Sequence, residues 1–175
     1  MRLLADKNSM GKTNDVYAIT LFDFDGNLKN LYFHINLYSR KTEQYTENTT
    51  WNTIENHEVL ALVDTGATIC GISKRMIKKM KLEPLREDEI CFVKGNTESS
   101  IYILDVIFPK GKVFENIEAV EINDPDRLRM PHDFIIGMNI LRQGDVAITS
   151  VNGKIAFSFR IPPAEKYIDF ELQDI

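Results

Sequence analysis

The sequence predicts a mostly β fold with one or two short helices. Residues 31–38 and 155–161 alternate between apolar and polar side chains, as strands with one buried face do. The dipeptide Asn152-Gly153 precedes the second run and is a strong signal for a two-residue hairpin turn. A length of 175 residues gives room for one domain with a core, but hardly for two catalytic lobes.

The N-terminal half of the domain is expected to consist of strands. Residues 16–24 and 31–38 are rich in β-forming side chains and flank Asp25-Gly26-Asn27, so we expect them to pair as a hairpin. After a polar segment, residues 59–63 are continuously apolar, which is typical of a strand buried on both faces. This strand leads directly to Asp64.

A helix and a series of further strands are expected after Asp64. Ser73 can cap a helix that runs to about Lys81, and Pro84 prevents its continuation. The polar, glycine-containing residues 94–100 are expected to form the tip of a mobile hairpin. A short helical turn is expected to end near Gly144. Strands are expected at residues 90–93, 101–108, 113–122 and 155–161.

The composition excludes several classes of protein. The apolar fraction is 43%, and no stretch approaches the roughly 20 apolar residues that a membrane helix needs. Cys70 and Cys91 are the only cysteines, too few for a disulfide framework. These observations predict a soluble, cytoplasmic protein that does not associate with a membrane.

Charge and histidine spacing argue against two kinds of partner. The net charge of -5 disfavours a broad nucleic-acid surface, and the basic residues at 74–81 have the spacing of one solvated helix face. His34, His57 and His132 are scattered without the spacing of metal ligands. We therefore expect no nucleic-acid partner, no metal and no cofactor.

Asp64 is the strongest candidate for a chemical role. It opens the turn Asp64-Thr65-Gly66, where hydrophobic walls can shift the pKa of a carboxylate and a glycine allows another backbone to approach. Peptide hydrolysis by acids needs two carboxyls, one to activate water and one to protonate the carbonyl oxygen. The motif occurs once, so a two-fold axis between two copies of the chain has to supply the second carboxyl.

Two segments carry a family resemblance. Residues 62–68, with the sequence Leu-Val-Asp-Thr-Gly-Ala-Thr, resemble the active-site loop of retropepsin-like aspartic proteases. Residues 134–141 resemble the apolar-apolar-glycine segment that packs behind this loop in the family and opens its C-terminal helix. The predicted hairpin lies between them, in family order, so the resemblance covers roughly residues 57–161. The Asn152-Gly153 hairpin is more similar to cellular and bacterial members than to viral ones.

The resemblance implies an acid-protease barrel, closed or partly open, with one lobe per chain. We therefore expect a flexible lead-in at residues 1–14, a single retropepsin-like domain at residues 15–161, and a C-terminal tail at residues 162–175. The implied activity is that of a homodimeric aspartic endopeptidase, in which a water is activated between two Asp64 carboxylates.

The resemblance also implies roles for individual residues. Asp64 would be the catalytic acid, Thr65 would hydrogen-bond across the dimer axis, and Gly66 would direct its backbone N–H toward the carboxylates. The substrate would be an extended polypeptide, bound by strand addition beneath a flap. The residues expected to contact it are Ala67, Thr68, Val93, Lys94, Gly95, Asn96 and Ile136.

The sequence departs from the viral pattern at two paired positions. Many retroviral enzymes have Asp two residues after the catalytic glycine and Arg directly after the second-motif glycine, whereas this chain has Thr68 and Met138. Loss of both partners leaves no buried charge unpaired, but an ion pair that stabilises the viral dimer is missing.

Other interpretations compete with the protease hypothesis. Residues 21–28 resemble the first motif of haloacid-dehalogenase-type phosphatases, with Asp23 as nucleophile and Asp25 as acid/base beside magnesium. That family has helices between its strands, which the alternating run that follows does not offer. Gly144-Asp145 is explained by a helix end, and the apolar surroundings of Cys70 indicate a core residue. A non-catalytic dimerisation or peptide-binding module on the same fold is the alternative function.

Overall fold

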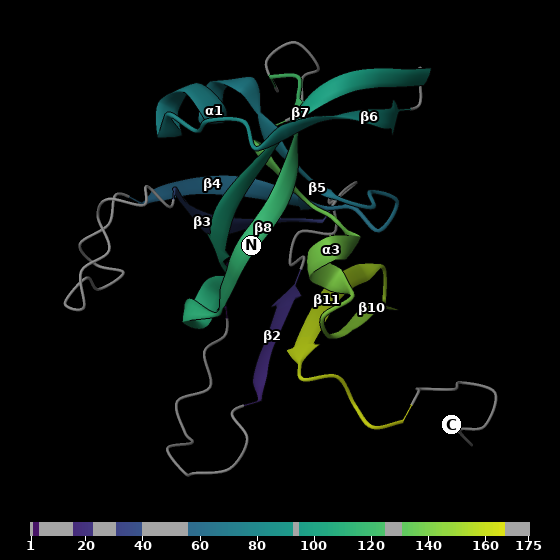
Figure 1. The fold of residues 1–175 in the computed structure, drawn as a ribbon. Coiled ribbons are helices and arrows are strands. Elements are labelled where there is room, and N and C mark those ends of the chain that lie inside the picture. Colours follow the sequence, from purple (N-terminus) through teal and green to yellow (C-terminus); the bar gives the residue numbers. More distant parts are fainter. Residues whose placement is uncertain are drawn as a thin grey trace.

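Two β-sheets contain most of the residues that the structure describes (Figure 1). The computed structural model describes residues 2–3, 16–22, 31–39, 56–92, 95–124 and 131–166. The strands are β1 (Arg2–Leu3), β2 (Tyr17–Phe22), β3 (Tyr32–Tyr38), β4 (His57–Val63), β5 (Cys70–Ser73), β6 (Arg86–Phe92), β7 (Gly95–Ile107), β8 (Val113–Ile122), β9 (Phe134–Ile136), β10 (Asp145–Val151) and β11 (Lys154–Ile161). The helices are α1 (Lys74–Met80) and α3 (Met138–Leu141), with a 3-10 turn, η2 (Pro109–Gly111).

The larger sheet closes on itself, with β6 outside the ring. Its strand order is β3-β4-β9-β5-β8-β7-β6, and β3 pairs with β7 as well as with β4. A separate four-stranded sheet has the order β1-β2-β11-β10. The prediction of a mostly β fold with short helices is therefore confirmed, although the two sheets together do not form one strict barrel.

The expected hairpin between the first two long strands is wrong. β2 pairs with β11, with Tyr17 opposite Ile161, whereas β3 pairs with β4, with Tyr32 opposite Leu62. Each strand buries one apolar face, and a local hairpin alone cannot cover such a face. Long-range pairing within two separate sheets provides that cover, and residues 23–30 between the strands lie outside the described residues.

Part of the expected N-terminal lead-in is also structured. Arg2 and Leu3 pair with Phe22 and Leu21 as the short strand β1. The expectation of a lead-in without structure is therefore wrong for these two residues, because the edge of β2 offers backbone hydrogen bonds to a passing segment.

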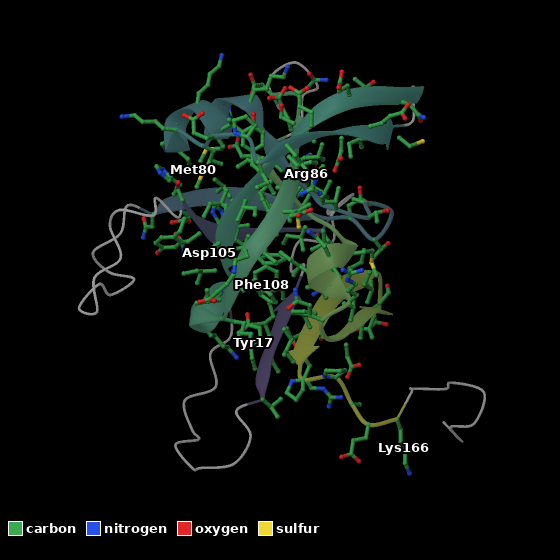
Figure 2. All side chains as sticks on the ribbon, viewed as in Figure 1. Tyr17, Met80, Arg86, Asp105, Phe108 and Lys166 are labelled. Atoms are coloured by element: carbon green, nitrogen blue, oxygen red, sulfur yellow. The ribbon has the colours of Figure 1, made fainter. Side chains whose placement is uncertain are left out.

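The core lies where the two sheets face each other. Phe33 from β3 stacks on Phe157 from β11, with ring centroids 6.0 Å apart, and meets Phe108 edge-on at 5.2 Å. Phe108, which is labelled in Figure 2, also contacts Phe114 of β8 and Phe159 of β11. Aromatic side chains from both sheets therefore pack against it. Such packing stabilises the fold through buried apolar area and favourable ring geometry.

The predicted helix after the Asp64 region is confirmed. Ser73 caps α1, because its side chain accepts a hydrogen bond from the backbone N–H of Met76 at 3.3 Å, and Lys81 ends the helix in the left-handed conformation. The apolar face is buried and consists of Met76, Ile77 and Met80. The basic residues of this helix are left on its solvated side, as expected.

The two predicted hairpin turns differ in outcome. Asn152 and Gly153 both have positive φ, at 52° and 76°, and connect β10 to β11 as the sequence predicted. The other hairpin turns earlier than expected, because Gly95 already pairs with Phe92 and residues 95–100 belong to β7. The tip predicted at residues 94–100 is therefore wrong for residues 95–100, and residues 93–94 lie outside the described residues.

Candidate active site

Asp64 stands directly after β4, at the start of a loop that we call the Asp64 loop (residues 64–69). Strand β9 runs parallel to β4, and the Asp64 backbone N–H donates to the Ile136 carbonyl at 3.1 Å. The Gly66 backbone N–H donates to the Asp64 carboxylate at Oδ1, at 2.8 Å. Asp64 is half-buried while Thr65 and Gly66 are exposed, so the turn is accessible and its carboxylate is held by the chain's own backbone.

The far end of the Asp64 loop is held by the segment behind it. The Met138 backbone N–H donates to the Ala67 carbonyl at 2.8 Å. A Cβ on Gly137 would lie 2.6 Å from the backbone carbonyl carbon and oxygen of Ile69 and 2.9 Å from the Ala67 oxygen. Only a glycine permits this approach, which explains physically why the second motif contains one.

Asn139 ties the loop to a third segment. Its Oδ1 accepts hydrogen bonds from the Cys70 backbone N–H at 3.0 Å and from the Cys70 thiol at 2.9 Å. Its Nδ2 donates to the Glu118 carbonyl on β8 at 2.8 Å. The sequence reasoning missed this role, because no local pattern distinguishes a bridging asparagine from a solvent-exposed one.

Cys70 is a buried structural residue. Burial raises the pKa of its thiol to about 12, and hydrogen bonds with Gly137 and Asn139 lower it by less. A thiol with this pKa supplies almost no thiolate near neutral pH. The expectation that Cys70 is a core residue rather than a nucleophile agrees with this environment.

Strand β9 places the side chains of Ile135 and Ile136, the two isoleucines of the second motif, on opposite faces of the sheet. Ile136 is paired with Val63 and is fully buried, with 0% of its surface exposed. Ile135 is half-buried, and its register partners are Leu62 on β4 and Gly71 on β5. Neighbouring side chains on a strand point to opposite faces, so the expectation that Ile136 contacts substrate is wrong and Ile135 is the residue of the pair with exposed surface.

The hairpin of β6 and β7 carries the predicted flap residues, and it extends away from the rest of the larger sheet (Figure 1). Gly95 has a φ of 113°, a Cβ added to it would meet nothing within 4 Å, and Asn96 donates to Glu89 at 3.0 Å. Gly95 and Asn96 are both exposed. Val93 and Lys94 lie outside the described residues, as do Asp23 and Asp25 of the phosphatase-like motif.

The remaining predicted positions near Asp64 differ in their exposure. Ala67 is half-buried and Thr68 is exposed, whereas Met138 is half-buried at the start of α3. Asp145 accepts hydrogen bonds from Arg160 and from the Ala164 backbone N–H. Asp145 therefore has a structural role as the first residue of β10, whereas the helix α3 that was expected to end near Gly144 already ends at Leu141.

Asp133 is a half-buried acid that no sequence pattern singled out. The Ser73 hydroxyl donates to it at 2.7 Å, and Arg75 binds both carboxylate oxygens, with Nη2 at 2.7 Å from Oδ2. Burial raises its pKa, but the hydrogen bonds from Arg75 and Ser73 and the nearby positive charge produce a net lowering. Asp133 thus fixes α1 against the entry to β9 as an ionised group.

The described residues contain no helix long and apolar enough to cross a membrane. Nor does this part of the chain bring together three or more side chains of the kinds that bind a metal ion.

The described residues form a mostly β fold, in which the Asp64 carboxylate lies at an accessible turn and Gly137 packs closely behind the loop that follows it. The family model for gag-polyprotein putative aspartyl protease matches residues 52–143, which is more than half of the chain. The chain therefore belongs to this family, and its resemblance to retropepsin-like proteases is confirmed.

Among solved structures, a retropepsin-like aspartic protease from Rickettsia conorii is similar, with 17% identity and a TM-score of 0.47 over 86% of this chain and 98% of that one. No curated protein matches the chain significantly.

Proposed function

We propose that the chain is an aspartic endopeptidase that acts as a homodimer. The observation that carries this proposal is the position of the Asp64 carboxylate. It accepts a hydrogen bond from the Gly66 backbone N–H at an accessible turn, in a chain that belongs to a family of putative aspartyl proteases. Thr65 and Gly66 beside it are exposed in the single chain. Residues that meet a second copy at a dimer axis have to be exposed in this way before the dimer forms. The chain contains one Asp-Thr-Gly motif, so the second carboxylate comes from a second copy.

In this proposal two Asp64 side chains hold one water between them. One carboxylate removes a proton from the water, whose oxygen bonds to the peptide carbonyl carbon, while the other carboxyl protonates the carbonyl oxygen. The C–N bond then breaks as a carboxyl gives its proton to the leaving nitrogen, which yields a carboxylic acid and an amine. The two acids share a proton, because two adjacent negative charges repel each other, and they titrate as a coupled pair. Thr65 is proposed to hold the two loops together across the axis.

The substrate is proposed to be an extended polypeptide between the Asp64 loop and the β6–β7 hairpin. Its backbone would pair by strand addition, and its side chains would alternate between the two sides. Ile135 replaces Ile136 among the proposed contacts, since Ile136 has no exposed surface. The other proposed contacts are Ala67, Thr68, Val93, Lys94, Gly95 and Asn96.

The proposal is tested by Asp64→Asn. This change keeps the side-chain volume but removes proton transfer, so cleavage in a peptide-library digest should fall by roughly a thousandfold or more. Sedimentation should still show a dimer. Glu165→Gln is the matched control, because it neutralises an exposed carboxylate in the C-terminal segment, and its activity should be unchanged.

Two results would contradict the proposal. Unchanged cleavage by Asp64→Asn would show that this carboxylate does not catalyse the reaction. Peptide binding by the wild-type dimer without cleavage at any pH would identify the non-catalytic module instead. Cleavage should also resist EDTA and be blocked by a statine-type mimic of the transition state.

A further inference from the structure

Arg86, at the start of β6, binds a strand outside its own hairpin. Its Nη1 and Nη2 donate to the two carboxylate oxygens of Glu118 on β8, each at 2.8 Å, and its Nε donates to Asp88 at 2.8 Å. In the strand order of the larger sheet, β7 lies between β6 and β8. The guanidinium of Arg86, which is labelled in Figure 2, therefore joins two strands that do not pair with each other. We call this contact the Arg86–Glu118 bridge.

The strand register shows where the Arg86–Glu118 bridge crosses β7. Arg86 lies opposite Ile101 on β7, and Glu118 lies opposite Ile103 on the same strand. Residues that pair directly share a face of a sheet, and so do residues two positions apart along one strand. The bridge therefore crosses β7 on the face that carries Ile101 and Ile103.

The same face of the larger sheet carries a residue that is proposed to contact the substrate. Direct pairs lead across three strands from Ile101 to Val120, then to Gly71, and then to Ile135. The Arg86–Glu118 bridge and Ile135 therefore lie on one face of the sheet. A hairpin that covers a substrate bound against Ile135 has to bend toward this face.

The two ends of the bridge are supported differently. In the described part of the chain, β6 lies at the end of the strand order and forms backbone pairs with β7 alone. By contrast, β8 pairs with β5 on one side and with β7 on the other, and the Glu118 carbonyl accepts a hydrogen bond from Asn139 at 2.8 Å. Glu118 is thus a fixed anchor, and its bond to Arg86 restrains the angle at which β6 leaves the sheet.

The geometry of the bridge distinguishes it from an ordinary surface ion pair. Isolated exposed pairs contribute little to stability, but a two-pronged guanidinium–carboxylate contact is stronger and fixes orientation as well as distance. The hydrogen bonds from Arg86 also lower the pKa of Glu118 below its ordinary value, so the pair stays ionised in weak acid. Because 40% of the Arg86 side chain and 38% of the Glu118 side chain are exposed, we expect an effect on the hairpin rather than on global stability.

We propose that Arg86 is a positioning residue for substrate binding, because its bonds to Glu118 hold the β6–β7 hairpin toward the Ile135 face of the larger sheet. The kinetic consequence rests on the proposed function, whereas the restraint on the hairpin is a property of the folded chain. Without the bridge the hairpin spends less time in the arrangement that binds a peptide, and the apparent affinity falls by that fraction. A bound peptide then orders the hairpin itself, so KM rises while kcat changes little.

The kinetic test is the variant Arg86→Met, which keeps an aliphatic stem and removes every hydrogen-bond donor. KM for a cleaved peptide should rise roughly three- to fivefold, while kcat changes by less than about twofold. Glu118→Met should raise KM by the same factor, and the double variant should raise it no further, because both changes remove one interaction. Lys74→Met is the control, since it breaks an exposed ion pair with Glu121, also on β8, at 3.0 Å, and its KM should match the wild type.

Amide hydrogen exchange separates failure of this inference from failure of the proposed function, because it requires no cleavage. In Arg86→Met, the amides that pair β6 with residues 95–99 of β7 should exchange roughly three- to fivefold faster, while those that pair β10 with β11 keep their rates. If the wild type cleaves no peptide, the proposed function fails, and the exchange rates still decide the role of Arg86. Unchanged exchange of the hairpin in Arg86→Met, an equal change in Lys74→Met, or an unchanged KM in an active Arg86→Met enzyme would overturn the inference.

Discussion

The Asp64 loop and the β6–β7 hairpin are held in different ways. The loop is held by β9 through the Ile136 carbonyl, by the start of α3 through the Met138 N–H, and indirectly by β8 through Asn139. The hairpin is held along its length by pairing between its own two strands, from Arg86 opposite Ile101 to Phe92 opposite Gly95. The Asp64 loop, which is expected to perform the chemistry, is thus held by hydrogen bonds to several elements. The hairpin tip, which is expected to cover the substrate, is held by the backbone pairing of β6 with β7.

Strand β7 contains both an exposed part and a part that is buried in the core. Its first residues, from Gly95 to Glu98, are exposed, whereas Leu104, Val106 and Ile107 are buried. The buried half anchors the hairpin, because removal of apolar surface from water supplies most of its stability. The exposed half has little apolar contact to lose, so local opening there costs little free energy. A covering hairpin that has to admit and release a peptide needs this property.

Gly137→Ala should cause the largest losses of stability and activity, because it changes the support of the Asp64 loop. The added Cβ would lie 2.6 Å from backbone atoms of Ile69, so either the Asp64 loop or β9 has to move. We expect a loss of about 3 kcal/mol or more in the free energy of unfolding, together with loss of activity. Chemical denaturation measures the first quantity.

Gly111→Ala is the control for this prediction. Its φ is positive, at 81°, unlike that of Gly137, and a Cβ there meets nothing within 4 Å, so only backbone strain of about 1 kcal/mol is expected. Equal losses in the two variants would mean that close approach behind the Asp64 loop is not what makes Gly137 necessary.

Asn139→Leu should have an intermediate effect. It leaves the Cys70 N–H and the Glu118 carbonyl without the side chain that joins them, which should cost about 2 kcal/mol. Activity should fall through kcat, because the Asp64 loop loses a support while the hairpin does not. Gln143→Leu, at an exposed residue of the following turn, should change stability by less than about 0.5 kcal/mol. Similar stability and kcat in the two variants would contradict the supporting role of Asn139.

Gly95→Ala should have the smallest effect on stability and the most selective effect on binding. The residue has a φ of 113° in open space, so strain of about 1 kcal/mol is confined to the hairpin. We expect KM for a peptide to rise several-fold, with little change in the midpoint of unfolding. Gly153→Ala introduces similar strain at a φ of 76° in the β10–β11 hairpin, and its KM should not change. A KM effect in both variants would indicate general loosening of the fold.

Features that depend on neighbours in the sequence could be predicted without the structure. The Ser73 cap, the helix that follows it and the Asn152-Gly153 turn each depend on a few adjacent residues, and all three are present. The Asp64 motif and its backing glycine were found because both are short and carry recognisable chemistry. The hairpin predicted between β2 and β3 failed, because nearness in sequence favours local pairing and says nothing of the other strands available.

The sequence by itself determined the fold class, the family and the position of the single candidate acid, since these follow from periodicity, turn chemistry and one motif. Tertiary structure alone decided that Ile135 rather than Ile136 has exposed surface, that Asn139 bridges three segments, and that the His132 ring is buried against Tyr32. The physical reason is that register and burial depend on which distant strands meet. The strand pairing that forms is the one that buries the most apolar area over the whole chain, and a local sequence pattern does not reveal it.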